Sequence, residues 1–174
     1  TRGFAAPELE ETYSRARELC REVDDSPHLL PVIFGQWAFH FARANLRRPL
    51  EVAREFLARA EQQHDPAVLA GHRIVGQPLL FLGELVAARE QLEQPVLRYV
   101  PDEHRFMAFL YGHDVGMASN SNLSMTLWLL GYPDAARQHS RESLRLVREV
   151  PHAHSQAYAL FFSAMVREFC GEWQ

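Results

Sequence analysis

The sequence predicts an all-α fold built from repeated helical hairpins, and three observations support this. Apolar residues recur at spacings of three and four, as on one face of a helix. Strand signals are missing, because threonine occurs only three times and valine and isoleucine rarely alternate with polar residues. Two segments share nearly the same frame, FLGELVAAREQL at 81–92 and LLGYPDAARQHS at 129–140. A frame used twice indicates a structural repeat.

The apolar stripes, with proline and glycine between them, predict nine helices: 7–23, 28–46, 49–64, 66–82, 84–99, 104–111, 116–130, 133–149 and 153–170. Leu85, Ala88 and Leu92 illustrate one such stripe. Asp65 followed by Pro66 places a capping residue before a proline at the first helical position. These signals predict an array of helices over the whole chain.

An Ala-Arg pair marks each expected repeat, with the alanines at positions 16, 53, 88 and 136. The separations are 37, 35 and 48 residues. Gly83 and Gly131 precede two of these alanines by five residues, where a tight turn needs a positive φ angle or a close contact. Each repeat is therefore predicted to be a helix–turn–helix in which the alanine lets two helices approach closely.

This pattern resembles the tetratricopeptide repeat (TPR), a helical hairpin of about 34 residues. Trp37 occupies the family's tryptophan position, and Gly76, Gly83, Ala88 and Leu92 make the second full copy the best match. The resemblance implies a right-handed α-solenoid of about three and a half repeats in one domain, 1–174. Its expected parts are a half-repeat 7–23, repeats 28–64, 66–99 and 102–149, and a half-repeat 153–174.

The third full repeat is enlarged by about 13 residues within 102–121. The segments HRFMAFLYGHDVG at 104–116 and LWLLGYPDAAR at 127–137 are similar to the C-terminal repeat array of large bacterial signalling ATPases, which carry linked cyclase, kinase or regulator domains. This resemblance implies a regulatory array. The chain begins with Thr1 rather than methionine, and we expect it to be a fragment of a longer protein.

Composition narrows the possible partners and chemistry. The 174 residues carry a formal net charge of −4, and all 18 cationic residues are arginine. Without lysine there is no Schiff-base or P-loop lysine, and without a basic excess we expect no nucleic-acid partner. Cys20 and Cys170 lie in apolar helical patterns and are predicted to be small core residues. No signal peptide or long apolar run appears, so we expect a cytoplasmic protein without membrane contact.

Sequence signatures of catalysis and cofactor binding are absent. There is no G-x-S-x-G, H-E-x-x-H, C-x-x-C, G-x-G-x-x-G or P-loop pattern. We therefore expect no enzyme, no cofactor and no metal. His113 and Asp114 could form an acid–base pair, but Asp114 is better interpreted as the cap of the following helix. His152 and His154 are two residues apart, which points them in different directions on a helix.

The TPR resemblance implies that the first helix of each repeat lines a concave groove. It suggests partner-binding residues at Asn45, Arg73, Gln77, Phe81, Ser121 and Met125. The first functional hypothesis is therefore a scaffold that binds a protein or peptide segment, including other domains of its own parent chain, in an open and continuous groove.

The alternative hypothesis is a small-ligand sensor. In this case the 102–121 insertion closes a pocket lined by Tyr111, His113 and Asn120. A last expectation concerns the half-repeat 153–174, where four apolar residues would lack part of their cover and would allow self-association: Leu160, Phe161, Ala164 and Met165.

Overall fold

The computed structural model describes residues 6, 8–22, 27–149 and 152–172, and all regular structure within these ranges is helical. The helices are α1 (Glu8–Glu22), α2 (Leu29–Ala42), α3 (Arg47–Gln62), α4 (Val68–Leu82), α5 (Leu85–Arg98), α6 (Pro101–His104), α7 (Met107–Leu110), α8 (Val115–Leu129), α9 (Pro133–Arg148) and α10 (Ala153–Phe169). The all-α prediction is confirmed.

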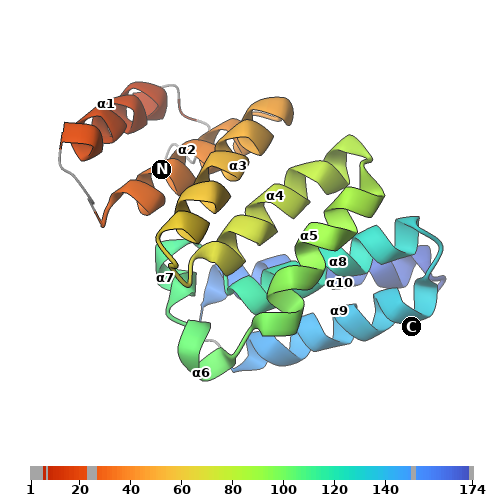
Figure 1. Ribbon diagram of the computed structural model, residues 1–174. Helices are drawn as coiled ribbons and strands as arrows, with labels where there is room; N and C mark the ends of the chain where they lie inside the picture. The colour runs from red at the N-terminus through yellow and green to blue at the C-terminus, as the bar shows by residue number, and fades with distance from the viewer. Residues whose placement is uncertain (1–5, 7, 23–26, 150–151, 173–174) are drawn as a thin grey trace.

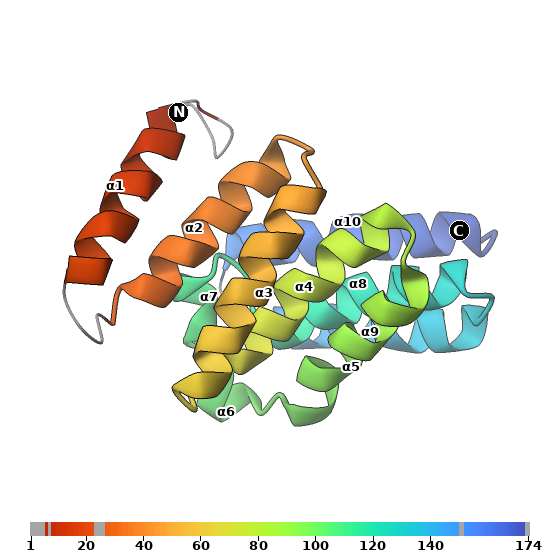
Figure 2. The same ribbon diagram turned by 45° about the horizontal axis from the view of Figure 1, so that its top comes forward.

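The helices stack in the order of the chain as antiparallel hairpins (Figures 1 and 2). The pairs α2/α3, α4/α5 and α8/α9 pack internally, and each pair packs against the next through α3/α4 and α5/α8. Helix α1 lies against α2, and α10 lies against both α8 and α9. This is a repeat-like arrangement in which most contacts join neighbours in sequence.

Small residues sit where the paired helices come closest. Ala53, Ala88 and Ala136, from the recurring Ala-Arg pairs, are fully buried. On the facing helix α4, a Cβ atom added to Gly76 would lie 2.6 Å from Cγ of Leu92. The predicted close approach of paired helices is thus seen between α4 and α5, where Gly76 lies beside Leu92 and Ala88 and a larger side chain would push the two helices apart.

The glycines of the shared frame form the hairpin turns. Gly83 and Gly131 adopt left-handed φ angles of 79° and 86°. The backbone N–H that follows each glycine donates back to the helix it closes, from Glu84 to the carbonyl of Leu79 and from Tyr132 to that of Leu127. This is the usual left-handed end of a helix, and it confirms the predicted turns.

The enlarged repeat differs in detail from the prediction. One helix was expected over 104–111, but the segment forms two helices of four residues each, α6 and α7. Pro101 begins α6, where its missing N–H is harmless. Helix α7 then places Met107 and Ala108 in the interior, with exposed fractions of 1 % and 0 %.

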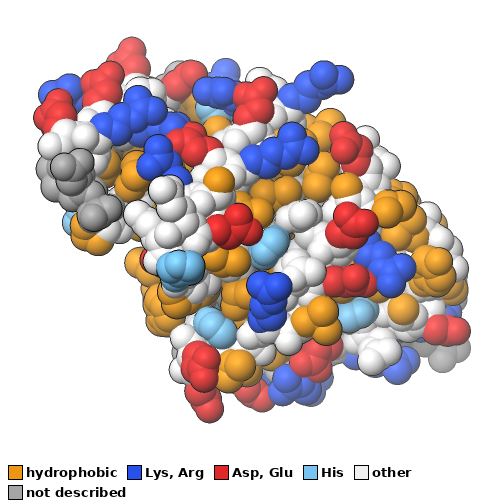
Figure 3. All heavy atoms as spheres, in the orientation of Figure 1, with side chains coloured by type: hydrophobic (Ala, Val, Ile, Leu, Met, Phe, Trp, Pro, Cys, Tyr) orange, Lys and Arg blue, Asp and Glu red, His pale blue; other side chains and the backbone are white. Residues whose placement is uncertain are grey.

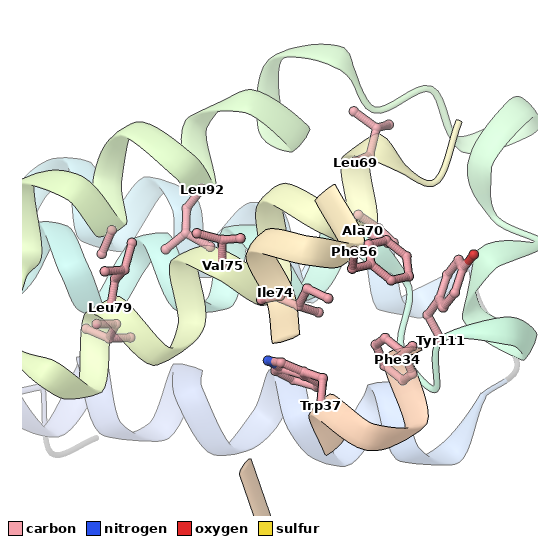
Figure 4. Packing of buried hydrophobic residues seen from close by; sticks show 14 of the residues in the cluster. Phe34, Trp37, Phe56, Leu69, Ala70, Ile74, Val75, Leu79, Leu92 and Tyr111 are labelled. Atoms are coloured by element: carbon pink, nitrogen blue, oxygen red, sulfur yellow. The ribbon is translucent and has the colours of Figure 1, made fainter. Parts of the chain in front are cut away.

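A large apolar cluster runs from α2 to α10, and Figure 4 shows part of it. Helix α8 crosses this region and is buried on all sides from Val115 to Leu127. Its serine, threonine and asparagine side chains bond to its own backbone or to neighbouring helices. Ser121 and Ser143 of α9, for example, lie 2.6 Å apart. Polar side chains that form hydrogen bonds such as these can be buried in the protein interior at little cost.

The surface in Figure 3 carries interspersed acidic and basic side chains. None of the helices in the described ranges is both long and apolar enough to cross a lipid bilayer. On α10, Leu160 and Phe161 are 60 % and 59 % exposed, Ala164 is exposed and Met165 is half-buried, as expected for this helix. Cys20 and Cys170 are free thiols at half-buried positions rather than in the core.

Candidate functional site

A pocket of about 240 Å³ opens between α2, α4, the loop after α7 and α10. Most of its wall is aromatic. The lining residues are Phe34, Trp37, Ala38, Phe41, Ala42, Gln77, Tyr111, Gly112, His113, His154 and Tyr158. A concave, mostly apolar site with a few polar groups is the usual form of a small-ligand site.

The α2 side of the pocket follows from helical periodicity. Phe34, Trp37, Ala38 and Phe41 are spaced to fall on one face of the helix. The ring centroids of Phe34 and Trp37 lie 5.3 Å apart, and those of Trp37 and Phe41 lie 5.2 Å apart. Such contacts between rings leave each one little freedom, so this wall is formed before any ligand arrives.

The segment 102–121 supplies a second side of the pocket. Gly112 adopts a left-handed φ angle of 68°, and the chain reverses there between α7 and α8. The turn presents Tyr111 and His113 to the pocket, and the Tyr111 ring packs on Phe34 at a centroid distance of 5.2 Å. Figure 4 shows Phe34, Trp37 and Tyr111 at this junction. The enlarged repeat therefore closes the pocket at one end.

Arg73 lies directly behind the aromatic wall and is only 1 % exposed. Its guanidinium carbon sits 5.8 Å from the ring centroid of Phe34 and 5.2 Å from that of Trp37. Nη1 donates to Oε1 of Gln77 at 3.1 Å, whereas Nε and Nη2 are buried without a partner. Among the described residues, no carboxylate pairs with this cation. Burial lowers the pKa of Arg73 to about 10, so it still carries its charge at neutral pH.

His113 is neutral at this site. Its ring lies between those of His154 and Tyr158, with centroid distances of 4.4 Å to each. Both ring nitrogens are buried without a hydrogen-bond partner. Burial, together with the charge of Arg73, lowers the pKa of His113 to about 2.

Tyr158 completes the wall from α10. Its hydroxyl donates to Oδ1 of Asn122 at 2.7 Å, and burial raises its pKa to about 12, so the phenol is also neutral. Nε1 of Trp37 and Nδ2 of Asn122 are further buried donors without partners. The pocket thus combines neutral aromatic surface with one uncompensated positive charge, which favours binding of a ligand over acid–base chemistry.

The residues predicted from the repeat pattern are only partly brought together. Gln77 lines the pocket and Arg73 lies behind it. Phe81 is 52 % exposed, and its ring packs on Phe41 at a centroid distance of 5.7 Å. Asn45 is exposed on the connection between α2 and α3.

The remaining two predicted residues lie elsewhere. Ser121 turns toward α9, where it pairs with Ser143, and Met125 is only 6 % exposed. Arg73, Gln77 and Ser121 are all buried, so they do not line an open, continuous groove. Of the three residues expected in a sensor pocket, two line the observed pocket. Tyr111 and His113 line it, whereas Oδ1 of Asn120 contacts Nδ1 of His139 at 2.8 Å.

No sequence signal singled out Tyr158 or His154 as pocket residues. Phe34, Trp37 and Phe41 on α2 have the helical spacing of ordinary core residues, and this spacing is the same for a core and for the wall of a pocket. The two α10 residues carry no motif, so only the packing of α10 against α8 and α9 reveals their part in the site.

Asp114 has the structural role that the sequence favoured. It caps α8 by accepting a hydrogen bond from the Met117 N–H at 2.7 Å, and it also accepts one from the Tyr99 hydroxyl. His152 caps α10 in a similar way, with Nδ1 facing the Ser155 N–H at 3.3 Å. The described residues contain no group of three or more histidine, cysteine or acidic side chains placed to hold a metal ion.

Comparison of this chain with protein-family models, with curated proteins and with solved structures finds no match. Its function therefore has to be argued from the geometry of the pocket.

Proposed function

We propose that this chain is a non-enzymatic regulatory domain that senses a small molecule in the pocket between α2, α4, α10 and the 111–113 loop. The observation that carries the proposal is the preformed aromatic wall around about 240 Å³ of space. A pocket of this size and composition suits the apolar body of a small ligand or a single large side chain.

The burial pattern favours a small molecule over an extended partner segment. A peptide lying along the array would need Arg73, Gln77 and Ser121 at the surface, and all three are buried. The pocket is a local depression, closed at one side by Tyr111 and His113. A partner segment that inserts one side chain there is the alternative outcome of the test below.

The pocket is also well placed to influence the whole array. Its walls come from α2, α4 and α10, which belong to different hairpins. An occupant would contact helices that otherwise meet mainly through the intervening ones. Because a ligand stabilises the state that binds it, occupancy would fix the spacing between the two ends of the array.

The proposal includes the wider architecture suggested by the repeats. We regard the array as a right-handed superhelix of about three and a half TPR-like hairpins within a cytoplasmic bacterial signalling protein. The shared turns at Gly83 and Gly131 and the buried alanines at 53, 88 and 136 support the repeat count. Stacked hairpins present binding surfaces built from several repeats, which suits a regulatory role.

The test fills the pocket and measures binding of a neutral aromatic probe. Ala38 lines the pocket on α2, and Ala38→Phe would occupy its space. Ala58 is exposed on α3, outside the pocket, so Ala58→Phe is the matched control. Isothermal titration with naphthalene-2-carboxamide should show saturable binding at one site for the wild-type protein and for Ala58→Phe, and at least a tenfold loss for Ala38→Phe.

Two results would count against a small-molecule pocket. One is the absence of saturable binding to the wild-type protein. The other is equal binding by Ala38→Phe and the wild-type protein, which would place the probe elsewhere.

A further inference from the structure

We infer that the occupant of this pocket is an anion, a small molecule with an apolar body and a carboxylate head, and that Arg73 is its counter-ion. This inference rests on the proposed function and adds the chemical class of the ligand. The shape of the pocket would accept neutral, cationic and anionic apolar molecules alike, so the choice among them depends on charge.

Arg73 is a buried cation without a partner of opposite charge among the described residues. Buried charges in proteins are normally paired with an opposite charge, because leaving one unpaired is costly. Arg73 is 1 % exposed and has no carboxylate partner in the described part of the chain. Its polar protein contact is the neutral amide of Gln77, at 3.1 Å. The charge balance of this site is therefore incomplete without an anion.

The side chains around Arg73 are also side chains of the pocket wall. Arg73 is enclosed by Phe34, Trp37 and Gln77, which it contacts directly. It is also close enough to His113 and Tyr158 to affect their titration. All five of these side chains line the pocket. The groups around the guanidinium thus also form the wall of the pocket, and we infer that the anion comes from that side.

The free donors of Arg73 lie together on one side of its guanidinium. Nη1 is used by Gln77, whereas Nε and Nη2 are the two unpartnered nitrogens. These two nitrogens form one edge of the planar guanidinium. A carboxylate binds such an edge through two parallel hydrogen bonds, one to each oxygen. The edge left free is thus the one that a carboxylate recognises.

The remaining groups favour an anion as well. His113 is neutral and adds no second positive charge, and no acidic side chain lines the pocket. An aromatic cage alone would attract a cation, but here Arg73 already lies against the rings of Phe34 and Trp37 and would repel one. Because Nε and Nη2 of Arg73 are covered, side chains of the pocket wall must move as the carboxylate enters. That movement would couple binding to the packing of the helices that form the wall.

The test compares three probes that share a naphthalene body and differ in the charge of the head group: naphthalene-2-carboxylate, naphthalene-2-carboxamide and 2-naphthylmethylamine. Each is titrated calorimetrically into the wild-type protein, Arg73→Met, Arg73→Lys and the control Arg54→Met. Arg54 is exposed on α3 and lies outside the pocket.

For the wild-type protein and Arg54→Met we expect the carboxylate to bind at least tenfold more tightly than the carboxamide, and the amine to bind most weakly. Arg73→Met should lose the preference for the carboxylate and keep its affinity for the carboxamide. Arg73→Lys retains a charge without the two-donor edge, so its preference should be intermediate. This variant also provides the readout if Arg73→Met fails to fold.

The outcomes separate the two proposals. If the wild-type protein binds the carboxylate no more tightly than the carboxamide, the small-molecule pocket is supported but the role of Arg73 is overturned. The same holds if Arg73→Met keeps the preference for the carboxylate. If none of the three probes binds the wild-type protein, the proposed function fails together with this inference.

Discussion

Replacing Arg73 with methionine should change the stability of the unliganded protein very little. The folded state disfavours the buried charge, since burial lowers the pKa of Arg73 from its ordinary value to about 10. A buried charge without a partner of opposite charge costs on the order of 3 kcal/mol. Methionine fills similar space without a charge and would remove this penalty.

Two favourable interactions of Arg73 are lost in the same substitution. Its cation–π contacts with Phe34 and Trp37 are worth about 2 kcal/mol when desolvated. Its hydrogen bond to Gln77 is worth about 1.5 kcal/mol. The gain and the losses nearly cancel, so we expect the free energy of unfolding to stay within about 1 kcal/mol of the wild-type value.

Urea denaturation followed by circular dichroism at pH 7 measures this directly, with Arg54→Met as the control. A residue kept for ligand binding is expected to add little to folding stability. Destabilisation by 3 kcal/mol or more would resemble the breaking of a buried ion pair. That result would show that Arg73 has a structural partner, and the reasoning that assigns it to a ligand would be refuted.

Four further substitutions test other parts of the structure. His113 stays neutral in the folded protein, where its pKa is about 2 against an ordinary value of 6.5. Its contribution to the free energy of unfolding is therefore complete above pH 6.5 and is lost as the pH falls below that value. Wild-type stability should therefore drop by about 2 kcal/mol more between pH 7 and pH 5 than that of His113→Phe in urea titrations, and equal slopes would contradict this. Gly83→Ala should destabilise the protein by about 1–2 kcal/mol through backbone strain alone, because its φ angle is 79° and nothing lies within 4 Å of the added Cβ. Ala44→Gly, at a φ angle of 58°, should have the opposite sign in the same denaturation assay. Gly76→Ala would press on the side chain of Leu92 and should cost about 1–3 kcal/mol; an unchanged melting temperature would argue against close packing of α4 on α5.

The fold was predictable where the sequence carries local signals. The turns at Gly83 and Gly131 and the buried alanines follow from side-chain size and backbone conformation, which act within a few residues. The division of 101–110 into two short helices did not follow. It depends on burying Met107 and Ala108 against distant parts of the chain, and no local pattern encodes that contact.

The site was predictable in part, and for a similar reason. Placement on the first helices of the repeats singled out Arg73 and Gln77, which meet at the pocket. The same placement put Ser121 in an open groove, although α8 is buried on all sides. Its serines and asparagines look like surface residues until their hydrogen-bond partners are known. Tyr158 belongs to a helix far along the chain, so its role required the packed structure.

The most direct test of the central claim observes the Arg73 side chain while a ligand binds. Nitrogen-15 NMR resolves arginine Nε–H groups, and the signal missing from Arg73→Lys identifies Arg73. Addition of naphthalene-2-carboxylate should move this signal saturably, whereas naphthalene-2-carboxamide should move it far less. If the carboxylate binds and the Arg73 signal does not move, the ligand does not pair with this buried cation, and the account of the pocket as an anion site is wrong.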